Sequence, residues 1–426
     1  MADENQSVAE ASAPPERQSA AFETARPAQS NLWLFALLIS VTALNSVAIN
    51  LLVPSLPRLA DEFGVDYGAA QLTTSVFLIA NAVGFLSLGA VSDRIGRRPA
   101  LICGLSLFTV ASAICAAAGS MQVLLVARTI EGVGASSGVV LGQSIIRDRY
   151  DHRRSASVIA YMALGYGAAP MVAPLIGGAV GDHLGWRANF VLLALAGLAA
   201  TLAAYRGLAE TARRTEGRGA LADLKTLAGE RGFWAFTLTY TCSFAIFYCF
   251  LAGTSYAARF ILNIDGTAYG VYFIVVNLGY SLAAYLTGRF VGRVGPTTMM
   301  AAGAAVALAA TIGMTIAFLL GHETALDYFL PMLIINFGNG LMQSNAIASV
   351  ASVRPELAGT ATGLAGALQV LFSAAAAMIV GATLSLTRSP AGFGLASAVF
   401  ACGALSASLW ARTIRVAGIL DAVEQR

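Results

Sequence analysis

The chain has 426 residues, of which 57% are hydrophobic and only 12% are charged. An ordinary soluble domain carries about 25% charged residues, so this composition excludes a soluble protein and predicts an integral membrane protein. The formal net charge of +3 is small, and no nucleic-acid partner is expected.

The sequence contains no Walker-type phosphate loop and no dinucleotide fingerprint, and its three histidines fall in different loops. ATP-driven transport, metal-dependent hydrolysis and a bound cofactor are therefore not expected, and the chain is not predicted to be an enzyme. The five cysteines lie in apolar stretches, where we interpret them as small buried hydrophobic residues and not as a disulfide framework or zinc site. They are Cys103, Cys115, Cys242, Cys249 and Cys402.

Residues 1–31 are rich in Ala, Pro, Gln, Ser and Glu, which predicts a disordered cytoplasmic tail and not a secretory signal peptide. From Leu32 onward, apolar runs of about 20 residues recur, and each is long enough to cross a bilayer core of about 30 Å. The pattern predicts an all-α membrane protein with twelve transmembrane helices. They are expected at residues 32–53, 70–90, 99–119, 122–144, 155–180, 188–206, 232–256, 268–290, 297–320, 327–350, 359–385 and 391–413.

The longest polar connection, at residues 207–231, divides the chain into two six-helix bundles. The first bundle is predicted over residues 32–206 and the second over 232–413, followed by a C-terminal tail at 414–426. Arginines decide the orientation, because cytoplasmic loops carry an excess of Lys and Arg. Most arginines lie on the side of the loop at 89–99, so this loop, the central connection and both termini are expected in the cytoplasm.

A short, strongly charged stretch, GAVSDRIGRRP, lies between the second and third apolar segments. It predicts a cytoplasmic turn in which Gly89 ends one helix and Pro99 helps to start the next. A solvated basic loop that only obeys the positive-inside rule is the alternative. The spacing G-x-x-x-D-R-x-G-R-R resembles the signature loop of the major facilitator superfamily of secondary transporters. The resemblance implies a cytoplasmic gate formed by Gly89, Asp93, Arg94, Gly96, Arg97 and Arg98.

The second half contains a degenerate copy of this loop. Residues Gly288 to Gly295 read GRFVGRVG, with Gly292 in the place of Asp93. The copy follows the second apolar segment of its half, as the first loop does, so the two halves are predicted to be structural repeats, with inverted repeats in the fold. We hypothesise that Asp93 meets a helix N-terminus or an arginine across the bundle interface when the protein faces outward.

The fourth apolar segment contains two ionisable residues, Arg128 and Glu131, in the run ARTIEGVGAS. Residues three apart share a helix face, and charges inside a membrane are functional candidates by default. Glu131 is therefore a candidate proton-coupling residue whose charge depends on its pairing with Arg128. A self-neutralising pair that only permits insertion is the alternative. The spacing of Arg128, Gly132 and Gly134 resembles a second superfamily motif, which usually has Gln where this chain has Glu131.

The fifth segment, GYGAAPMVAPLIGG, combines prolines with paired glycines. Proline removes a backbone hydrogen bond and glycine permits close helix packing, so the segment predicts a flexible, tightly packed interface, with an ordinary kinked helix as the alternative. A-P-x-x-G-G resembles the antiporter signature G-P-x-x-G-G, with alanine for the leading glycine. The residues that carry this resemblance are Pro170, Pro174, Gly177 and Gly178.

Over roughly residues 32–410 the chain resembles the bicyclomycin-resistance/CflA-type branch of drug:proton antiporters. The resemblance rests on NLLVPSLP from Asn50, the Asp93 loop, the Arg128 motif, APMVAP from Ala169, GWR from Gly185, Asn277 and AGTA from Ala358. In that branch the first helix usually carries a coupling aspartate where this chain has Asn50, and asparagine cannot titrate. Either Glu131 has taken over the coupling, or transport is less tightly coupled to protons.

Polar and aromatic side chains on otherwise apolar helices are expected to line a neutral, amphipathic substrate cavity, although each one alone is also explained by an interhelical hydrogen bond. They are Asn45, Asn50, Asn81, Tyr240, Tyr248, Asn277, Asn336, Asn339, Gln343, Asn345 and Gln369.

The sequence thus predicts a monomeric, proton-coupled exporter of small amphipathic compounds or drugs in the inner membrane, working by rocker-switch alternating access. Its only energy source is the proton motive force. An exporter of one endogenous metabolite or metal chelator, or a symport importer, are alternatives on the same fold. A membrane enzyme or a receptor is not expected, because no catalytic cluster or soluble domain is visible.

Overall fold

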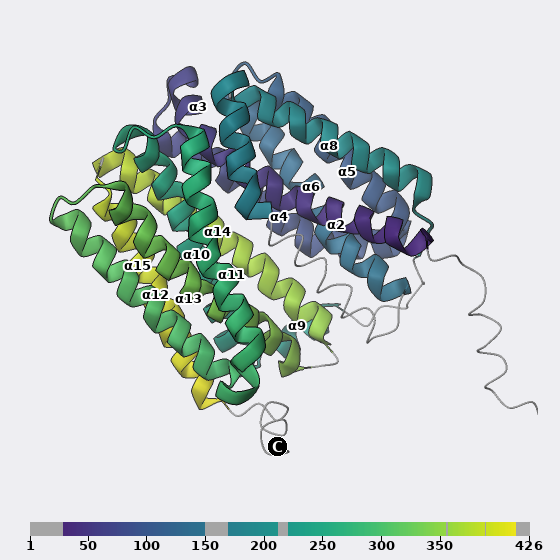
Figure 1. Cartoon of the computed structure of the whole chain (residues 1–426). Helices are drawn as coiled ribbons and strands as arrows, with labels where there is room; N and C mark the ends of the chain where they lie inside the picture. The colour runs from purple at the N-terminus through teal and green to yellow at the C-terminus, as the bar shows by residue number, and fades with distance from the viewer. Residues whose placement is uncertain (1–28, 150–168, 212–219, 355–356, 388, 415–426) are drawn as a thin grey trace, which may run out of the picture.

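The computed structural model describes residues 29–149, 169–211, 220–354, 357–387 and 389–414, and the long helices in these ranges form two groups of six (Figure 1). The first half contains α2 (Gln29–Asn50), α4 (Tyr67–Ile95), α5 (Arg97–Ala116), α6 (Met121–Arg149), a helix over 169–184 and α8 (Trp186–Gly207). The second half contains α10 (Arg231–Phe260), α11 (Gly266–Val294), α12 (Pro296–Leu319), α13 (Ala325–Val353), α14 (Ala358–Thr387) and α15 (Ala391–Thr413).

The twelve predicted spans coincide with these helices, which confirms the predicted all-α membrane fold. Ten of the described helices are long and apolar enough to cross a bilayer. Residues 155–168 of the fifth span, and residues 1–28 and 415–426 of the predicted tails at 1–31 and 414–426, lie outside the described residues, and α2 begins at Gln29, within the first predicted tail. Two predicted details are incomplete or wrong, one in the central connection and one at Gly89.

The central connection contains a helix, α9 (Ala220–Ala228), that its polar composition did not predict. Leu227 of α9 is buried in a small core cluster with Phe233 and Phe236 of α10, and this apolar contact explains why the segment is helical. The prediction that Gly89 ends a helix is also wrong. Helix α4 continues to Ile95, and the chain turns only at Gly96, where φ is 100° and a side chain would be strained.

The structure confirms the internal repeat and extends it. Gly295 has the same conformation as Gly96, with φ 83°, and α12 follows it directly, as α5 follows Gly96. The N-termini match as well, because Asp66 accepts a hydrogen bond from Ala69 N at 2.8 Å and Asp265 accepts one from Ala268 N at 2.7 Å. The pair α4–α5 and the pair α11–α12 are therefore copies of one unit, capped by aspartate and joined by glycine.

Most of the described polar contacts that join the two halves cluster at one end of the helices, where Asp182 lies. We call it the Asp182 end, and we call the opposite end, with the α4–α5 junction, the Arg97 end. At the Asp182 end, the Tyr67 hydroxyl donates to Ala252 O at 2.6 Å and the Ser255 hydroxyl donates to Val53 O at 2.6 Å. Val53 belongs to a 3-10 turn, η1 (Val53–Ser55), that leads into the short helix α3 (Leu56–Phe63).

Candidate functional site

An ion pair lies in the first half of α6, completely shielded from solvent. Arg128 Nη1 donates to Glu131 Oε2 at 2.8 Å, and both side chains are 0% exposed. A charge inside hydrocarbon costs about 2.5–3.5 kcal/mol on insertion scales, so an apolar pair of the same size would be far easier to insert. The pair is therefore a candidate for function.

Three other helices hold the Arg128 guanidinium in place. Its Nε donates to Thr73 O of α4 at 3.2 Å, and Nη1 also lies 3.4 Å from Ala48 O of α2. The Phe77 ring of α4 lies 4.3 Å away and the Phe190 ring of α8 lies 5.6 Å away, both within cation–π range. Among the described residues, Arg128 Nη2 has no hydrogen-bond partner. The guanidinium thus links four helices of the first half.

Helix α5 supplies the other contacts of the Glu131 carboxylate. Ser112 Oγ lies 2.7 Å from Glu131 Oε1, and Cys115 Sγ lies 3.8 Å from Oε2. All of these side chains are buried. The motif analysis missed Ser112 and Cys115, since nothing in the spacing along one helix indicates which residue of a neighbouring helix will face it.

The glycines after Glu131 explain how neighbouring helices come so close. A Cβ at Gly132 would overlap Phe77 O of α4, and a Cβ at Gly134 would overlap the Phe108 backbone of α5. A Cβ at Gly138 would likewise overlap Val41 O of α2. Each glycine therefore allows one neighbouring helix to contact the α6 backbone, and this close packing surrounds the ion pair.

A second charged group lies at the Asp182 end and crosses the interface between the halves. Asp182 accepts hydrogen bonds from Thr267 N at 2.8 Å and from Thr267 Oγ1 at 2.7 Å, at the N-terminus of α11. On its own side it forms an ion pair with Arg58 at 2.7 Å. A carboxylate at a helix N-terminus is stabilised by the helix dipole, so Asp182 holds α11 against the first half. The sequence analysis assigned no role to either residue.

The two glycines of the fifth helix allow close packing on both sides, Gly177 within the first half and Gly178 across the interface between the halves. A Cβ at Gly177 would overlap Leu51 O, and a Cβ at Gly178 would overlap Gly266 O at the start of α11. Pro170 and Pro174 lie on the same helix, in its described part. The tight packing predicted for this segment is therefore present.

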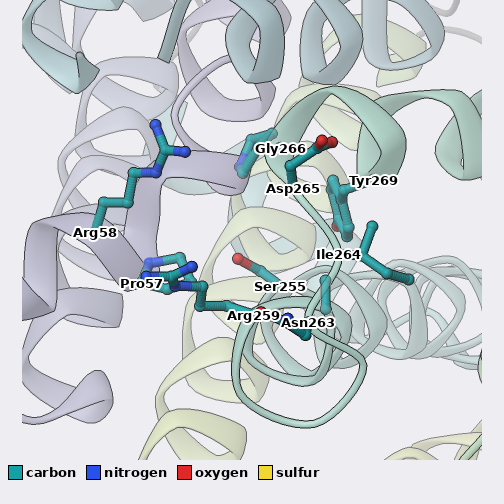
Figure 2. Close-up of a pocket in the computed structure, with 11 residues that line it drawn as sticks. Pro57, Arg58, Ser255, Arg259, Asn263, Ile264, Asp265, Gly266 and Tyr269 are labelled. Atoms are coloured by element: carbon teal, nitrogen blue, oxygen red, sulfur yellow. The ribbon is translucent and has the colours of Figure 1, made fainter. Parts of the chain in front are cut away.

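A small cavity of about 130 Å³ remains at the Asp182 end. Figure 2 shows side chains of both halves around it, with Pro57 and Arg58 on one side and Ser255 and Tyr269 on the other. Small-molecule sites have volumes of roughly 300–1,000 Å³. The cavity is thus a residual gap in a closed interface, too small to hold a drug-sized substrate.

At the Arg97 end, the predicted gate residues pair within the first half. Arg97 forms ion pairs with Asp93 at 2.7 Å and with Asp148 at 3.0 Å. The backbone N–H groups of Arg97 and Arg98 donate to Glu210 at 2.9 and 3.2 Å, and Arg98 also donates to Tyr205 O at 2.8 Å. The Asp93 side chain is 56% exposed. Gly89 and Arg94 lie on the last turns of α4.

The amides predicted to line the cavity mostly bond within their own helices. Asn50 donates to Ser46 O, Asn277 to Phe273 O, Asn345 to Leu341 O and Gln369 to the Ser373 hydroxyl. Asn81 links helices, because it donates to Asn45 Oδ1 at 2.8 Å and to Gly132 O at 3.1 Å, and Asn345 also contacts Met299 Sδ of α12 at 3.9 Å. The alternative of interhelical bonds is therefore supported for Asn45, Asn81 and Asn345, whereas the described bonds of Asn50 and Asn277 lie within their own helices. Tyr240 packs on Phe244.

The five cysteines are free thiols. Cys115, Cys242 and Cys249 are buried as predicted, but Cys103 and Cys402 are exposed on the outer faces of α5 and α15. A membrane helix can present a thiol to lipid at little cost, so apolar surroundings in the sequence do not imply burial in the protein.

Two six-helix bundles that meet at one end, with a buried charge pair inside the first bundle, define a membrane transporter and not an enzyme. The sequence model of the Major Facilitator Superfamily matches residues 38–377, and the chain belongs to this family. It is 28% identical over 345 residues to multidrug resistance protein D of Escherichia coli, which covers 80% of this chain and 86% of that protein.

Two further comparisons agree. A bicyclomycin resistance protein homolog of Haemophilus influenzae is 25% identical over 387 residues, covering 87% of this chain and 94% of that protein. The solved structure of a D-xylose-proton symporter superposes with a TM-score of 0.74, at 16% identity, and covers 92% of this chain and 99% of that one. The second comparison concerns the fold alone.

Proposed function

We propose that this transporter exports small amphipathic compounds, including drugs, in exchange for protons that bind at Glu131. The names of the two relatives, a multidrug resistance protein and a bicyclomycin resistance protein homolog, support export of drugs. The single observation that supports proton coupling is the fully buried Arg128–Glu131 pair. No cofactor takes part, the proton motive force supplies the energy, and the transporting unit is the monomer.

The protein lies in the inner membrane, and its Arg97 end faces the cytoplasm. This orientation is supported by the distribution of basic residues. Arg94 lies in the last turn of α4, Arg97 and Arg98 begin α5, and Arg289 and Arg293 lie near the end of α11, whereas few arginines lie near Asp182. An excess of Lys and Arg marks cytoplasmic loops, so both termini are cytoplasmic.

With this orientation, the described state is closed to the outside and faces inward. The halves meet at the Asp182 end through Asp182, Ser255 and Tyr67. Near the opposite end of α14, a Cβ added at Gly363 or Gly366 would meet no atom within 4 Å, which agrees with halves that diverge toward the cytoplasm. Rocking of the halves then opens the Asp182 end and closes the Arg97 end.

Glu131 couples this motion to protons through its two charge states. As a carboxylate it pairs with Arg128, and as a neutral acid it releases Arg128 from that pair. Entry of a proton from outside favours the inward-facing state, where the proton leaves and substrate binds. The substrate-loaded carboxylate form then returns to the outward-facing state, which gives one exchange per cycle.

Inside-out vesicles carrying the purified transporter test the proposal. Vesicles energised by a proton gradient should accumulate bicyclomycin or other compounds from a panel of unrelated drugs, and accumulation should end when the gradient is dissipated. Glu131→Gln should remove at least about nine-tenths of this accumulation, while Glu323→Gln, at an exposed loop carboxylate, should leave it unchanged. Wild-type accumulation and proton release by Glu131→Gln would place the coupling elsewhere.

A further inference from the structure

Ser112 has two acceptors within hydrogen-bond distance but only one hydrogen to give. Its Oγ lies 2.8 Å from Phe108 O of its own helix and 2.7 Å from Glu131 Oε1 of α6. A hydroxyl has one donor hydrogen and two acceptor lone pairs. Both short contacts can be hydrogen bonds at the same time only if Glu131 provides the second hydrogen.

The two charge states of Glu131 therefore need two positions of one hydroxyl hydrogen. When Glu131 is a neutral acid, its O–H donates to Ser112 Oγ and the Ser112 hydroxyl donates to Phe108 O. When Glu131 is a carboxylate, the Ser112 hydroxyl turns and donates to Oε1, and Phe108 O keeps the backbone N–H of its helix. Neither state leaves the Oε1 atom without a partner, and no helix has to move.

We propose that Ser112 is the positioning residue for the proton of Glu131, because its hydroxyl bonds the acid in both charge states. The inference rests on the proposed function of Glu131 and names the group that sets the pH at which the proton is exchanged. Arg128 contacts only Oε2, so Ser112 is the partner that the structure describes for Oε1.

The other charged or titratable groups around the carboxylate, among the described residues, are few. Arg128 faces it from α6 and the Cys115 thiol faces it from α5. Helices α2 and α4 contribute backbone carbonyls, and α4 and α8 contribute Phe rings, all of them directed at Arg128. Loss of the Ser112 hydroxyl thus leaves Oε1 of the carboxylate buried and without a donor, which favours the protonated acid.

The sequence supplies a rescue variant and a matched control. Ser112→Ala removes the hydroxyl, and Ser112→Thr keeps it on the same Cβ. Ser137→Ala removes another buried hydroxyl from the α5–α6 interface, where Ser137 Oγ donates to Gly134 O at 2.6 Å and makes no described contact with Glu131. Equal melting temperatures of the purified variants establish that each is folded.

Infrared difference spectroscopy over a pH series measures the protonated carboxylic acid directly and needs no substrate. The band lost in Glu131→Gln belongs to Glu131. In Ser112→Ala the pH midpoint of this band should rise by about one to two units, because a hydrogen bond to a charged group is lost. Ser112→Thr and Ser137→Ala should stay near the wild-type midpoint.

Three outcomes would overturn the role of Ser112: a wild-type midpoint in Ser112→Ala, an equal rise in Ser112→Thr, or an equal rise in Ser137→Ala. A different outcome would overturn the proposed function itself. If no titrating band disappears in Glu131→Gln, then Glu131 does not exchange a proton, whatever the Ser112 variants do.

Discussion

The two ends of the molecule use similar charged residues in opposite ways. At the Asp182 end a carboxylate of the first half binds the N-terminus of α11 in the second half. At the Arg97 end the carboxylates Asp93 and Asp148 bind Arg97 of their own half. Charged groups therefore join the two halves at the Asp182 end, whereas at the Arg97 end Asp93, Asp148 and Arg97 pair within the first half. We interpret the Arg97 end as a gate whose partners across the interface are met only in the other state.

The Asp182 end itself contains two related contacts that differ in charge. The N-terminus of α11 binds the Asp182 carboxylate, whereas the N-terminus of α4, its repeat, binds the neutral Ser385 hydroxyl at 2.8 Å. Arg58 adds a positive charge to the first contact. The fold thus repeats the helices of the interface but not its electrostatics, and the charged contact should contribute more to closure.

The largest effect is expected where closure depends on backbone contact. Gly178→Leu places a side chain against Gly266 O, so the Asp182 end cannot close and export should fall to background. Gly313→Leu is the control, because a Cβ at Gly313 meets no atom within 4 Å. Vesicle accumulation and the amount of inserted protein check both variants. Wild-type export by Gly178→Leu would show that tight closure is not needed.

The next effect concerns the gate at the Arg97 end. Asp93→Asn keeps the size of the side chain but removes the charge that α5 and the opposite half can recognise, so export should fall at least about tenfold with the protein still inserted. Inside-out vesicles provide the measurement, with Glu323→Gln as the control. Undiminished export would show that the charge of Asp93 is not needed to close the gate at the Arg97 end.

A smaller effect is expected from the charge at the Asp182 end. Asp182→Asn keeps an acceptor for α11 but loses the ion pair with Arg58 and the charge–dipole attraction. The fraction of molecules closed at this end should fall by roughly fivefold to tenfold. Distances between spin labels placed on α3 and α11 report this fraction. An unchanged distance distribution would mean that glycine packing alone holds the end closed.

The smallest effect is expected for the neutral repeat of that contact. Ser385→Ala removes one hydroxyl that accepts from Gly68 N and donates to Asp66, and the closed fraction should change by no more than about twofold. The same spin-labelled positions serve for the measurement. An effect as large as that of Asp182→Asn would remove the distinction between the charged and the neutral contact.

The sequence was sufficient for the twelve long helices and for the repeat, because both leave local patterns in the sequence, although it missed α9. Apolar runs located the long helices, the fifth of them in its described part, and the GxxxxRxG echo located the matching turns at Gly96 and Gly295. Gly89 was misplaced because glycine also occurs inside membrane helices, where only the backbone conformation distinguishes a turn.

The candidate site was only half predictable for a different reason. Arg128 and Glu131 stand out because charge is rare in apolar segments. Ser112 is one of many serines, and only the close packing of α5 and α6 at Gly134 brings it to Glu131. The role of Asp182 could not be predicted for the same reason, since its partner Thr267 lies in the other half of the chain. Asn50, Asn277 and Asn345 attracted attention as polar residues, but the amide nitrogen of each donates to a carbonyl oxygen of its own helix.

The central claim is that protonation of Glu131 decides which of the two ends is closed. Spin-label distances across the Asp182 end and across the Arg97 end, measured over a pH series in lipid, test it directly. Acidification should shorten the first distance and lengthen the second with one common midpoint, and Glu131→Gln should hold the Asp182 end closed at every pH. Ends that move independently, or a Glu131→Gln variant that responds to pH as wild type does, would contradict the claim.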